Sequence, residues 1–185
     1  MAEFYLISQL PSLDAIGDNT PMPIDEERFM ELCREHLNRK AQREMENLTI
    51  CPSADYERTG SALPGAWYEA ERNLRLALAK VRAEKMHKSF DMRQMRISQE
   101  FTDAATEAIN AENPLEAERF LFKFRMGYLE NLRPMDNFSL DFLFYYGIKL
   151  KLIMRMRRFD TELGEDAYRD IYSSILSGDR TEAIQ

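Results

Sequence analysis

Two pairs of neighbouring residues in this sequence are of types that bind metals. Glu84 and His87 form a Glu-x-x-His unit, which in di-iron helical bundles places a carboxylate and an imidazole one helical turn apart. Such a site requires a second copy and two further glutamates, but this sequence has one copy, flanked by lysines whose charge opposes a divalent cation. Cys33 and His36 could supply two zinc ligands, whereas a closed zinc site requires four. We therefore expect no metal, with Glu84 and His87 on a solvated helix surface, Cys33 in the core and His36 at the surface.

The motifs of common catalytic sites are also missing from the sequence. There is no Gly-x-Ser-x-Gly and no phosphate-binding glycine-rich loop, and only two histidines are present to act as general bases. Carboxylates are abundant, but no pair lies in an apolar setting that would separate two pKa values. We expect a protein that is not an enzyme and that holds no cofactor.

Helices are the elements that must position these residues, because the 185 residues include only seven Gly and seven Pro. Apolar residues recur at spacings of three and four along most of the chain. The sequence predicts an all-α fold, an elongated multi-helix bundle of about six to seven helices with no significant β-sheet. Residues 1–65 are expected to form an N-terminal segment with a helical hairpin and hinge loops, and residues 66–185 the main helical bundle. The residues that mark the two hinge windows are Pro11, Gly17, Pro21, Pro23, then Pro52, Gly60, Pro64 and Gly65.

Capping residues predict where four helices begin. These residues are Asp25, Asn38, Asn113 and Ser139. Residues 66–113 contain no Gly or Pro, so their two apolar stripes belong either to one helix of about 70 Å or to two helices with a bend near Ser89. The helices expected after Asn113 and Ser139 are apolar on nearly all sides, which is typical of helices in the centre of a bundle or against a partner. A last amphipathic helix is expected to carry Leu163, Ala167, Ile171, Ile175 and Leu176.

Gly127 and Gly147 lie inside two of these predicted helices. A glycine there costs about 1 kcal/mol relative to alanine. We therefore expect another element to approach closely at both positions.

Charge is distributed in opposed blocks. The formal net charge is −7, yet residues 72–96 hold eight bases and two acids, and a second basic cluster lies near residues 149–158. Small alanines accompany the first block, which argues against a membrane surface, and the net acidity of the chain argues against nucleic acid. A solvated face or a contact with an acidic protein is favoured. We hypothesise two partner-binding surfaces. The first consists of Arg72, Arg75 and Arg82, and the second of Lys149, Lys151, Arg155 and Arg157.

The expected compartment is the cytoplasm. No signal peptide is recognisable at the beginning of the sequence, and the two cysteines are expected to stay reduced. The longest apolar run, residues 138–156, contains Asp141, Lys149 and Lys151, so it predicts a buried helix and not a membrane span.

Three stretches of the sequence resemble a known family. They are residues 4–13 (FYLISQLPSL), 29–37 (FMELCREHL) and 137–150, from NFSLD through YYGIKL. Together they resemble a bacterial family of uncharacterised proteins that accompanies the other components of V/A-type ATPases and stands in for their C-type subunit, which is the d-type subunit in eukaryotes. The C-type subunit itself has about three similar helical domains and is far longer, so this chain would supply a reduced version.

The resemblance implies an all-helical, non-enzymatic socket between the central stalk and the proteolipid ring. Such a connector transmits torque between ATP hydrolysis and ion transport, of protons or of sodium. Its partners would be other ATPase subunits, and it would lie in the cytoplasm, peripheral on the inner face of the cell membrane. The alternative hypothesis is a free-standing cytoplasmic helical adaptor that binds another protein, and a third is an enzyme whose site these patterns do not reveal.

Overall fold

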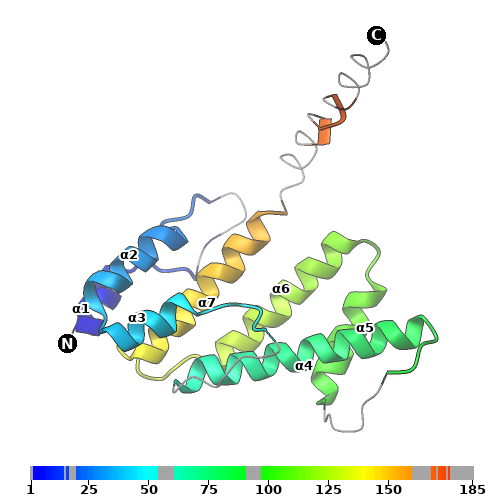
Figure 1. Ribbon diagram of the computed structural model, residues 1–185, viewed down its shortest axis with the longest axis horizontal. Coiled ribbons are helices and arrows are strands. Elements are labelled where there is room, and N and C mark those ends of the chain that lie inside the picture. The colour runs from blue at the N-terminus through cyan, green and yellow to red at the C-terminus, as the bar shows by residue number, and fades with distance from the viewer. Residues whose placement is uncertain are drawn as a thin grey trace, which may run out of the picture.

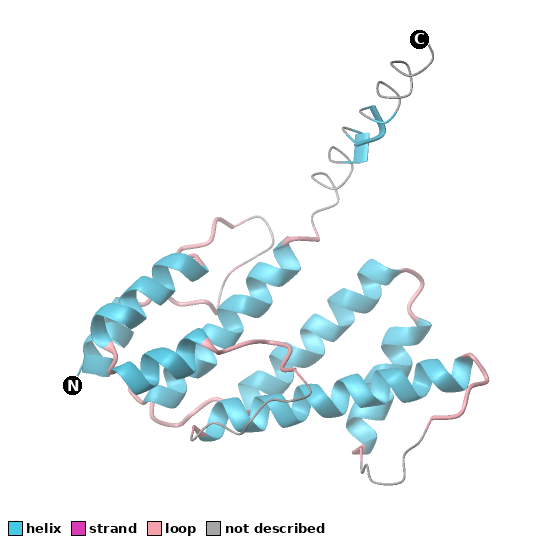
Figure 2. Ribbon diagram, viewed as in Figure 1, coloured by secondary structure: helices cyan, strands magenta, loops and turns pink. Residues whose placement is uncertain are grey.

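The computed structural model describes residues 2–14, 16, 20–53, 61–90, 97–159, 168–169, 171–173 and 175. Within these residues the chain forms α-helices and no strand, which confirms the predicted all-α bundle (Figures 1 and 2). The seven helices with defined bounds are α1 (Ala2–Gln9), α2 (Glu26–His36), α3 (Arg39–Glu46), α4 (Ala62–Lys85), α5 (Gln99–Asn110), α6 (Pro114–Asn131) and α7 (Leu140–Arg157). The predicted last helix lies mostly outside the described residues, although Ile171 and Ile175 are helical.

Two hydrophobic clusters form the core. In the first, α1, α2, α3 and the beginning of α4 surround α7, and in the second the remainder of α4 packs with α5 and α6 (Figure 1). Helix α4 contributes Trp67 to the first cluster and Leu74 to the second, and α6 contributes Leu129 and Leu121 in the same way. The division of the chain at residue 65 stays a prediction, and the first cluster contains residues from both sides of it.

Helix α7 is the central helix of the first cluster. All eight residues from Leu143 to Leu150 are buried, as its hydrophobicity on nearly all sides predicts. Helix α6 is not central, because only Leu121, Arg125 and Leu129 are buried and they lie on one face; the alternative of a partner against it stays a prediction. The aromatic residues beside that face are partly exposed, so α6 lies at the side of the bundle.

The predicted caps are confirmed at all four helix starts. In each case the side-chain oxygen of the cap accepts a hydrogen bond from the backbone N–H three residues later, which satisfies a donor that has no partner inside the helix. The pairs are Asp25 with Arg28 (2.7 Å), Asn38 with Ala41 (3.0 Å), Asn113 with Glu116 (2.9 Å) and Ser139 with Phe142 (3.2 Å).

The second hinge window is only partly a loop. Helix α4 begins at Ala62, so Pro64 and Gly65 lie in its first turn. A proline is tolerated there, because the first N–H groups of a helix have no carbonyl partner within it. At its other end α4 stops at Lys85, His87 adopts a left-handed φ of 54°, and α5 packs back against α4. The predicted bend near Ser89 is therefore confirmed, and the alternative of one 70 Å helix is wrong.

Gly147 and Gly127 have different surroundings. A Cβ atom on Gly147 would lie 3.0 Å from Cδ2 of Leu48 and 3.2 Å from Cε1 of Phe29. Both neighbours are buried, at 3% and 1% exposure. A Cβ on Gly127 would meet nothing within 4 Å. The expected close approach is confirmed for Gly147 and is wrong for Gly127.

We expect these two glycines to respond to alanine with opposite signs. Gly147→Ala should lower the free energy of unfolding by about 1–2 kcal/mol, because the new methyl group overpacks a filled core. Gly127→Ala should raise it by about 0.5–1 kcal/mol, because alanine restricts the unfolded chain and favours a helix. Urea denaturation of both variants measures the difference, and a shift of the same sign in both would contradict the packing described for Gly147.

Candidate functional site

The residues considered as metal ligands do not come together. Glu84 is an exposed residue of α4 with its carboxylate 3.9 Å from the Lys80 ammonium, whereas His87 follows the end of that helix. Burial raises the pKa of the Cys33 thiol to about 12, and His36 is nearer the surface. Among the residues that the structure describes, no group of three or more His, Cys, Asp or Glu side chains is placed to hold a metal ion.

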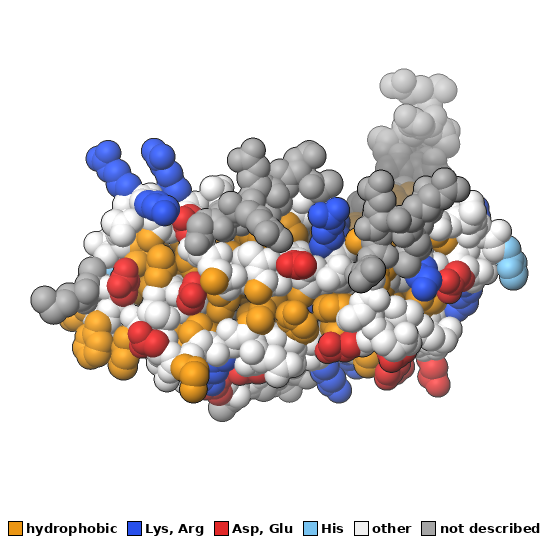
Figure 3. Space-filling view, turned by 90° about the horizontal axis from the view of Figure 1, so that it is seen from below, with side chains coloured by type: hydrophobic (Ala, Val, Ile, Leu, Met, Phe, Trp, Pro, Cys, Tyr) orange, Lys and Arg blue, Asp and Glu red, His pale blue; other side chains and the backbone are white. Residues whose placement is uncertain are grey.

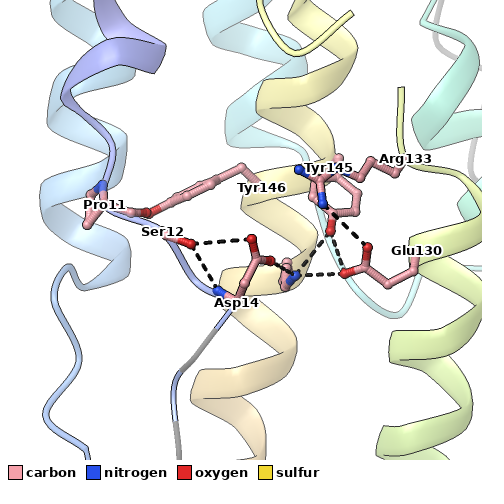
Figure 4. A network of polar contacts seen from close by, with 8 residues as sticks. Pro11, Ser12, Asp14, Glu130, Arg133, Tyr145 and Tyr146 are labelled. Atoms are coloured by element: carbon pink, nitrogen blue, oxygen red, sulfur yellow. Dashed lines mark hydrogen bonds and ion pairs between the residues drawn. The ribbon is translucent and has the colours of Figure 1, made fainter. Parts of the chain in front are cut away.

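A buried lysine is the centre of a polar network between α6, α7 and the segment after α1 (Figure 4). The Lys149 ammonium donates to Asp14 Oδ1 at 2.6 Å, Glu130 Oε1 at 2.7 Å and the Tyr145 hydroxyl oxygen at 3.1 Å. Tyr145 in turn donates its own proton to Glu130 Oε1 at 2.5 Å. An ammonium group has three N–H donors, so all of them are used.

This network holds Lys149 in its charged form. Burial lowers the pKa of Lys149, but hydrogen bonds to Asp14 and Glu130 outweigh burial and raise it above its usual value. A protonated amine is not a nucleophile. The lysine side chain is only 5% exposed, so the structure corrects the expectation that Lys149 contacts a partner. Its role is to connect three segments of the chain.

The other members of the second basic cluster also bind within the chain. Lys151 forms an ion pair with Glu26 of α2, and Arg155 pairs with Glu118 of α6 at 2.9 Å. The Arg157 guanidinium donates a hydrogen bond to the carbonyl of Thr20. These contacts join α7 to its neighbours, so the cluster is not one open basic surface.

The first basic set lies along α4, and its three members are exposed. Arg75 donates to the carbonyl of Pro52 at 2.8 Å and thereby joins α4 to the residues that follow α3. Arg72 and Arg82 form no hydrogen bond or ion pair with another described residue. These two arginines remain candidates for contact with an acidic partner.

A second buried ion pair joins the two hydrophobic clusters. Arg125 of α6 binds Glu71 of α4 through two parallel hydrogen bonds, each of 2.9 Å, and the side chains are 8% and 1% exposed. The Cys51 thiol lies 3.8 Å from the same carboxylate. Burial and the charge of Glu71 raise the pKa of the Cys51 thiol, so it is not activated as a nucleophile.

A small hollow that is open to solvent lies between α6 and α7, beside this ion pair. Its charged residues are paired: Arg125 with Glu71, and Arg155 with Glu118. We refer to it as the α6–α7 groove. The residues that line it are Glu118, Phe122, Arg125, Leu152, Arg155, Met156 and Phe159.

Large aromatic side chains are exposed at the end of the molecule where α1 lies. Phe4 and Tyr5 of α1 are 56% and 59% exposed, and Phe138, just before α7, is 47% exposed. The Phe4 and Phe138 rings contact each other, with centroids 4.5 Å apart. Figure 3 shows hydrophobic side chains gathered at this end. We call Phe4, Tyr5 and Phe138 the aromatic patch.

Sequence reasoning missed the aromatic patch, although a signal was present. Residues 4–7 are four successive apolar residues, and successive residues of a helix point about 100° apart. They cannot all face the core, so a helix through them must expose some of its large side chains. Leu6 is the one that is completely buried.

The three stretches that carry the family resemblance pack against one another. The Tyr146 hydroxyl donates to the carbonyl of Pro11 at 2.9 Å, and the rings of Phe29 and Tyr146 have centroids 5.3 Å apart. Residues 4–13, 29–37 and 137–150 therefore belong to one packed unit in the first hydrophobic cluster.

Comparison of the chain with models of known protein families, with curated proteins and with solved structures finds no match. None of the described helices combines the length and the hydrophobicity that crossing a membrane requires. The described residues form an all-α protein. The ion pairs of Lys149 and Arg125 join its helices, and the aromatic patch is exposed.

Proposed function

We propose that this chain is a non-catalytic connector that binds other proteins through the aromatic patch. The observation that carries the proposal is the exposure of three large aromatic side chains at one end of the molecule. Two of them, Phe4 and Phe138, come from segments far apart in the sequence and form one contact. Contiguous exposed apolar side chains are typical of sites that are covered by another molecule, and aromatic residues are enriched where interfaces are buried.

The complex that we propose for this connector is a bacterial V/A-type rotary ATPase, with the central stalk and the proteolipid ring as partners. Support comes from the family resemblance, because residues 4–13 and 137–150 both carry it and both contribute to the aromatic patch. The chain would then work in proton or sodium transport as a structural subunit, held at the inner face of the membrane by its protein partners.

A second candidate is a free-standing cytoplasmic adaptor for an acidic protein. Arg72 and Arg82 favour it, because both are exposed on α4 and form no ion pair with another described residue. Unpaired surface charges of one sign accelerate association with a partner of the opposite sign.

Co-purification distinguishes the two candidates. The tagged full chain, recovered from detergent-solubilised bacterial membranes, should bring ATPase subunits with it. The double variant Phe4→Ser, Phe138→Ser should reduce that recovery at least about tenfold, because central aromatic contacts dominate interface affinity. Met86→Ser is the matched control, since Met86 is 59% exposed and lies at the end of α4.

Each result decides between the candidates. Failure of the unmodified chain to recover any ATPase subunit would contradict the rotary ATPase. Equal recovery by the unmodified chain and the double variant, with unchanged helical circular dichroism, would exclude the aromatic patch as the contact. Recovery of a different acidic protein that is lost in the variant Arg72→Glu, Arg82→Glu would favour the adaptor.

A further inference from the structure

The exposed apolar surface extends beyond the three side chains of the aromatic patch. Met135 lies three residues before Phe138, at most about 10 Å away along the chain, and it is fully exposed. On the other side, the Tyr5 ring packs edge-on against the His36 ring of α2, with centroids 5.2 Å apart. The surface therefore involves three parts of the chain: the end of α2, α1 and the turn before α7.

The charged side chains beside the patch are acidic. Residues 1–8 and 135–141 include the whole patch, and they contain three acids and no Lys or Arg. On the face seen in Figure 3, acidic side chains lie among the hydrophobic ones at this end of the molecule. The three acids are Glu3, Asp136 and Asp141.

These three carboxylates are not neutralised within the described part of the chain. None of them forms an ion pair with another described residue. Asp136 accepts a hydrogen bond from the backbone N–H of Phe138 at 2.9 Å, which holds its charge beside the patch. Arg133 is the base nearest to Phe138 in the sequence, but its guanidinium lies 3.9 Å from Glu130 and 5.7 Å from the centre of the Tyr145 ring.

We propose that the aromatic patch binds a basic amphipathic helix of another protein, with large apolar side chains on one face and lysine or arginine at the edges of that face. This inference rests on the proposed function, in which the patch binds proteins, and it names the kind of partner. The apolar face of the partner covers Phe4, Tyr5 and Phe138, and its basic residues lie against the three acids. Opposite charges around an apolar contact select the partner and fix its orientation.

A helix fits this surface better than an extended peptide does. Among the described residues there is no sheet edge to which an extended peptide could add as a strand. A helix satisfies its own backbone hydrogen bonds, so side chains alone can form the contact.

The acids also disfavour two other occupants of the patch. The anionic headgroups of a membrane surface would repel the three carboxylates. A second copy of this chain, related by a twofold axis, would place the acids of one patch against the acids of the other. A basic partner converts the same charges into attraction.

Binding of two synthetic amphipathic peptides to the full chain tests the charge of the partner. Each peptide is about 14 residues long, or about four helical turns, with leucine on one face. The other face carries lysine in the first peptide and glutamate in the second. Fluorescence anisotropy of the labelled peptides should give an affinity at least about tenfold higher for the lysine peptide. Phe4→Ser, Phe138→Ser should weaken binding of the lysine peptide at least about tenfold.

A triple variant isolates the contribution of the three charges. Replacing each acid by its amide, as Glu3→Gln, Asp136→Asn, Asp141→Asn, should weaken binding of the lysine peptide at least about fivefold and reduce its dependence on salt. The matched control makes the same change in net charge at exposed acids in and between α5 and α6, and it should leave the affinity within about twofold of the unmodified value. This control is Glu107→Gln, Glu112→Gln, Glu116→Gln.

The outcomes separate this inference from the proposed function. Equal binding of the two peptides would overturn the basic partner, and so would unchanged binding in the triple variant when Phe4→Ser, Phe138→Ser weakens it; in both cases the patch would remain a protein contact. Unchanged binding in the Phe4→Ser, Phe138→Ser variant, with unchanged helical circular dichroism, would exclude the patch itself. Binding to anionic phospholipid vesicles, or dimers in sedimentation equilibrium, that this double variant abolishes would assign the patch to a membrane or to a second copy.

Photo-crosslinking examines the natural partner in the same way. With p-benzoylphenylalanine in place of Tyr5, irradiation during co-purification links the chain to whichever protein lies against the patch. Mass spectrometry should place the link in a helix with more Lys and Arg than Asp and Glu. A link in an acidic or uncharged segment would overturn the proposal, and the absence of any link would contradict the patch as the contact.

Discussion

Arg125→Met is expected to lower the free energy of unfolding by about 3–5 kcal/mol, because it leaves the carboxylate of Glu71 buried without a partner. That carboxylate is 1% exposed and accepts both of its strongest hydrogen bonds from Arg125. The loss should affect the whole protein, since the pair joins α4 to α6 between the two hydrophobic clusters. Urea denaturation at neutral pH measures this loss as a lower urea concentration at the midpoint, with an unchanged dependence of the free energy of unfolding on urea concentration.

Two further variants show whether the buried charge causes this effect. The double variant Glu71→Leu, Arg125→Met should recover most of the lost stability, because replacing both partners by apolar groups leaves no unpaired charge. Arg28→Met removes an exposed ion pair with Glu31, whose side chains are 55% and 50% exposed, and should cost less than about 1 kcal/mol. If the double variant were as unstable as Arg125→Met alone, the loss of stability would come from lost packing and not from the unpaired charge of Glu71.

Lys149→Met is expected to lower the free energy of unfolding by about 2–4 kcal/mol at neutral pH. This loss is smaller than that of Arg125→Met, because the two carboxylates that lose their partner are both in contact with water. Asp14 and Glu130 are 59% and 41% exposed at the side chain, whereas the lysine is 5% exposed. The methionine retains most of the volume, so the loss reports mainly on the charge network. Lys151→Met is the matched control on α7, and its effect should be smaller because its ion pair with Glu26 is more exposed.

The same variant should also change how stability depends on pH. The hydrogen bond with Lys149 lowers the pKa of Asp14, and hydrogen bonds from Lys149 and Tyr145 lower the pKa of Glu130 despite burial, which raises it. A carboxyl group whose pKa is lower in the folded state adds stability above its unfolded pKa of about 4, and this stability is lost as pH falls through the folded value. Urea denaturation between pH 2 and pH 7 should therefore show that acid lowers the free energy of unfolding less in Lys149→Met than in the unmodified protein. An equal decrease in both proteins would contradict the role assigned to the network.

Local features of the fold were predictable from the sequence. The caps at Asp25, Asn38, Asn113 and Ser139 depend on a side chain and a backbone group three residues away, so neighbouring residues determine them. The central position of α7 follows from its hydrophobicity on nearly all sides. Helix α1 was not predicted, because its eight residues are short for a periodicity argument.

The pairing of charges was not predictable from local pattern. Lys149 and Asp14 are separated by 135 positions and Arg125 and Glu71 by 54, so only the tertiary fold brings the partners together. The sequence nevertheless contained a signal for each site. Arg125 lies four residues from both Leu121 and Leu129, and Lys149 lies in an apolar run. A charged side chain on a buried helix face needs an oppositely charged or hydrogen-bonding partner there, so each position indicated a buried ion pair.

Helix α4 gives the molecule a stiff axis. It has 24 residues, about 36 Å of uninterrupted helix, and it packs in both hydrophobic clusters. Bending one cluster relative to the other would therefore require breaking backbone hydrogen bonds in α4 and separating Glu71 from Arg125. We therefore expect the two clusters to move as one rigid unit.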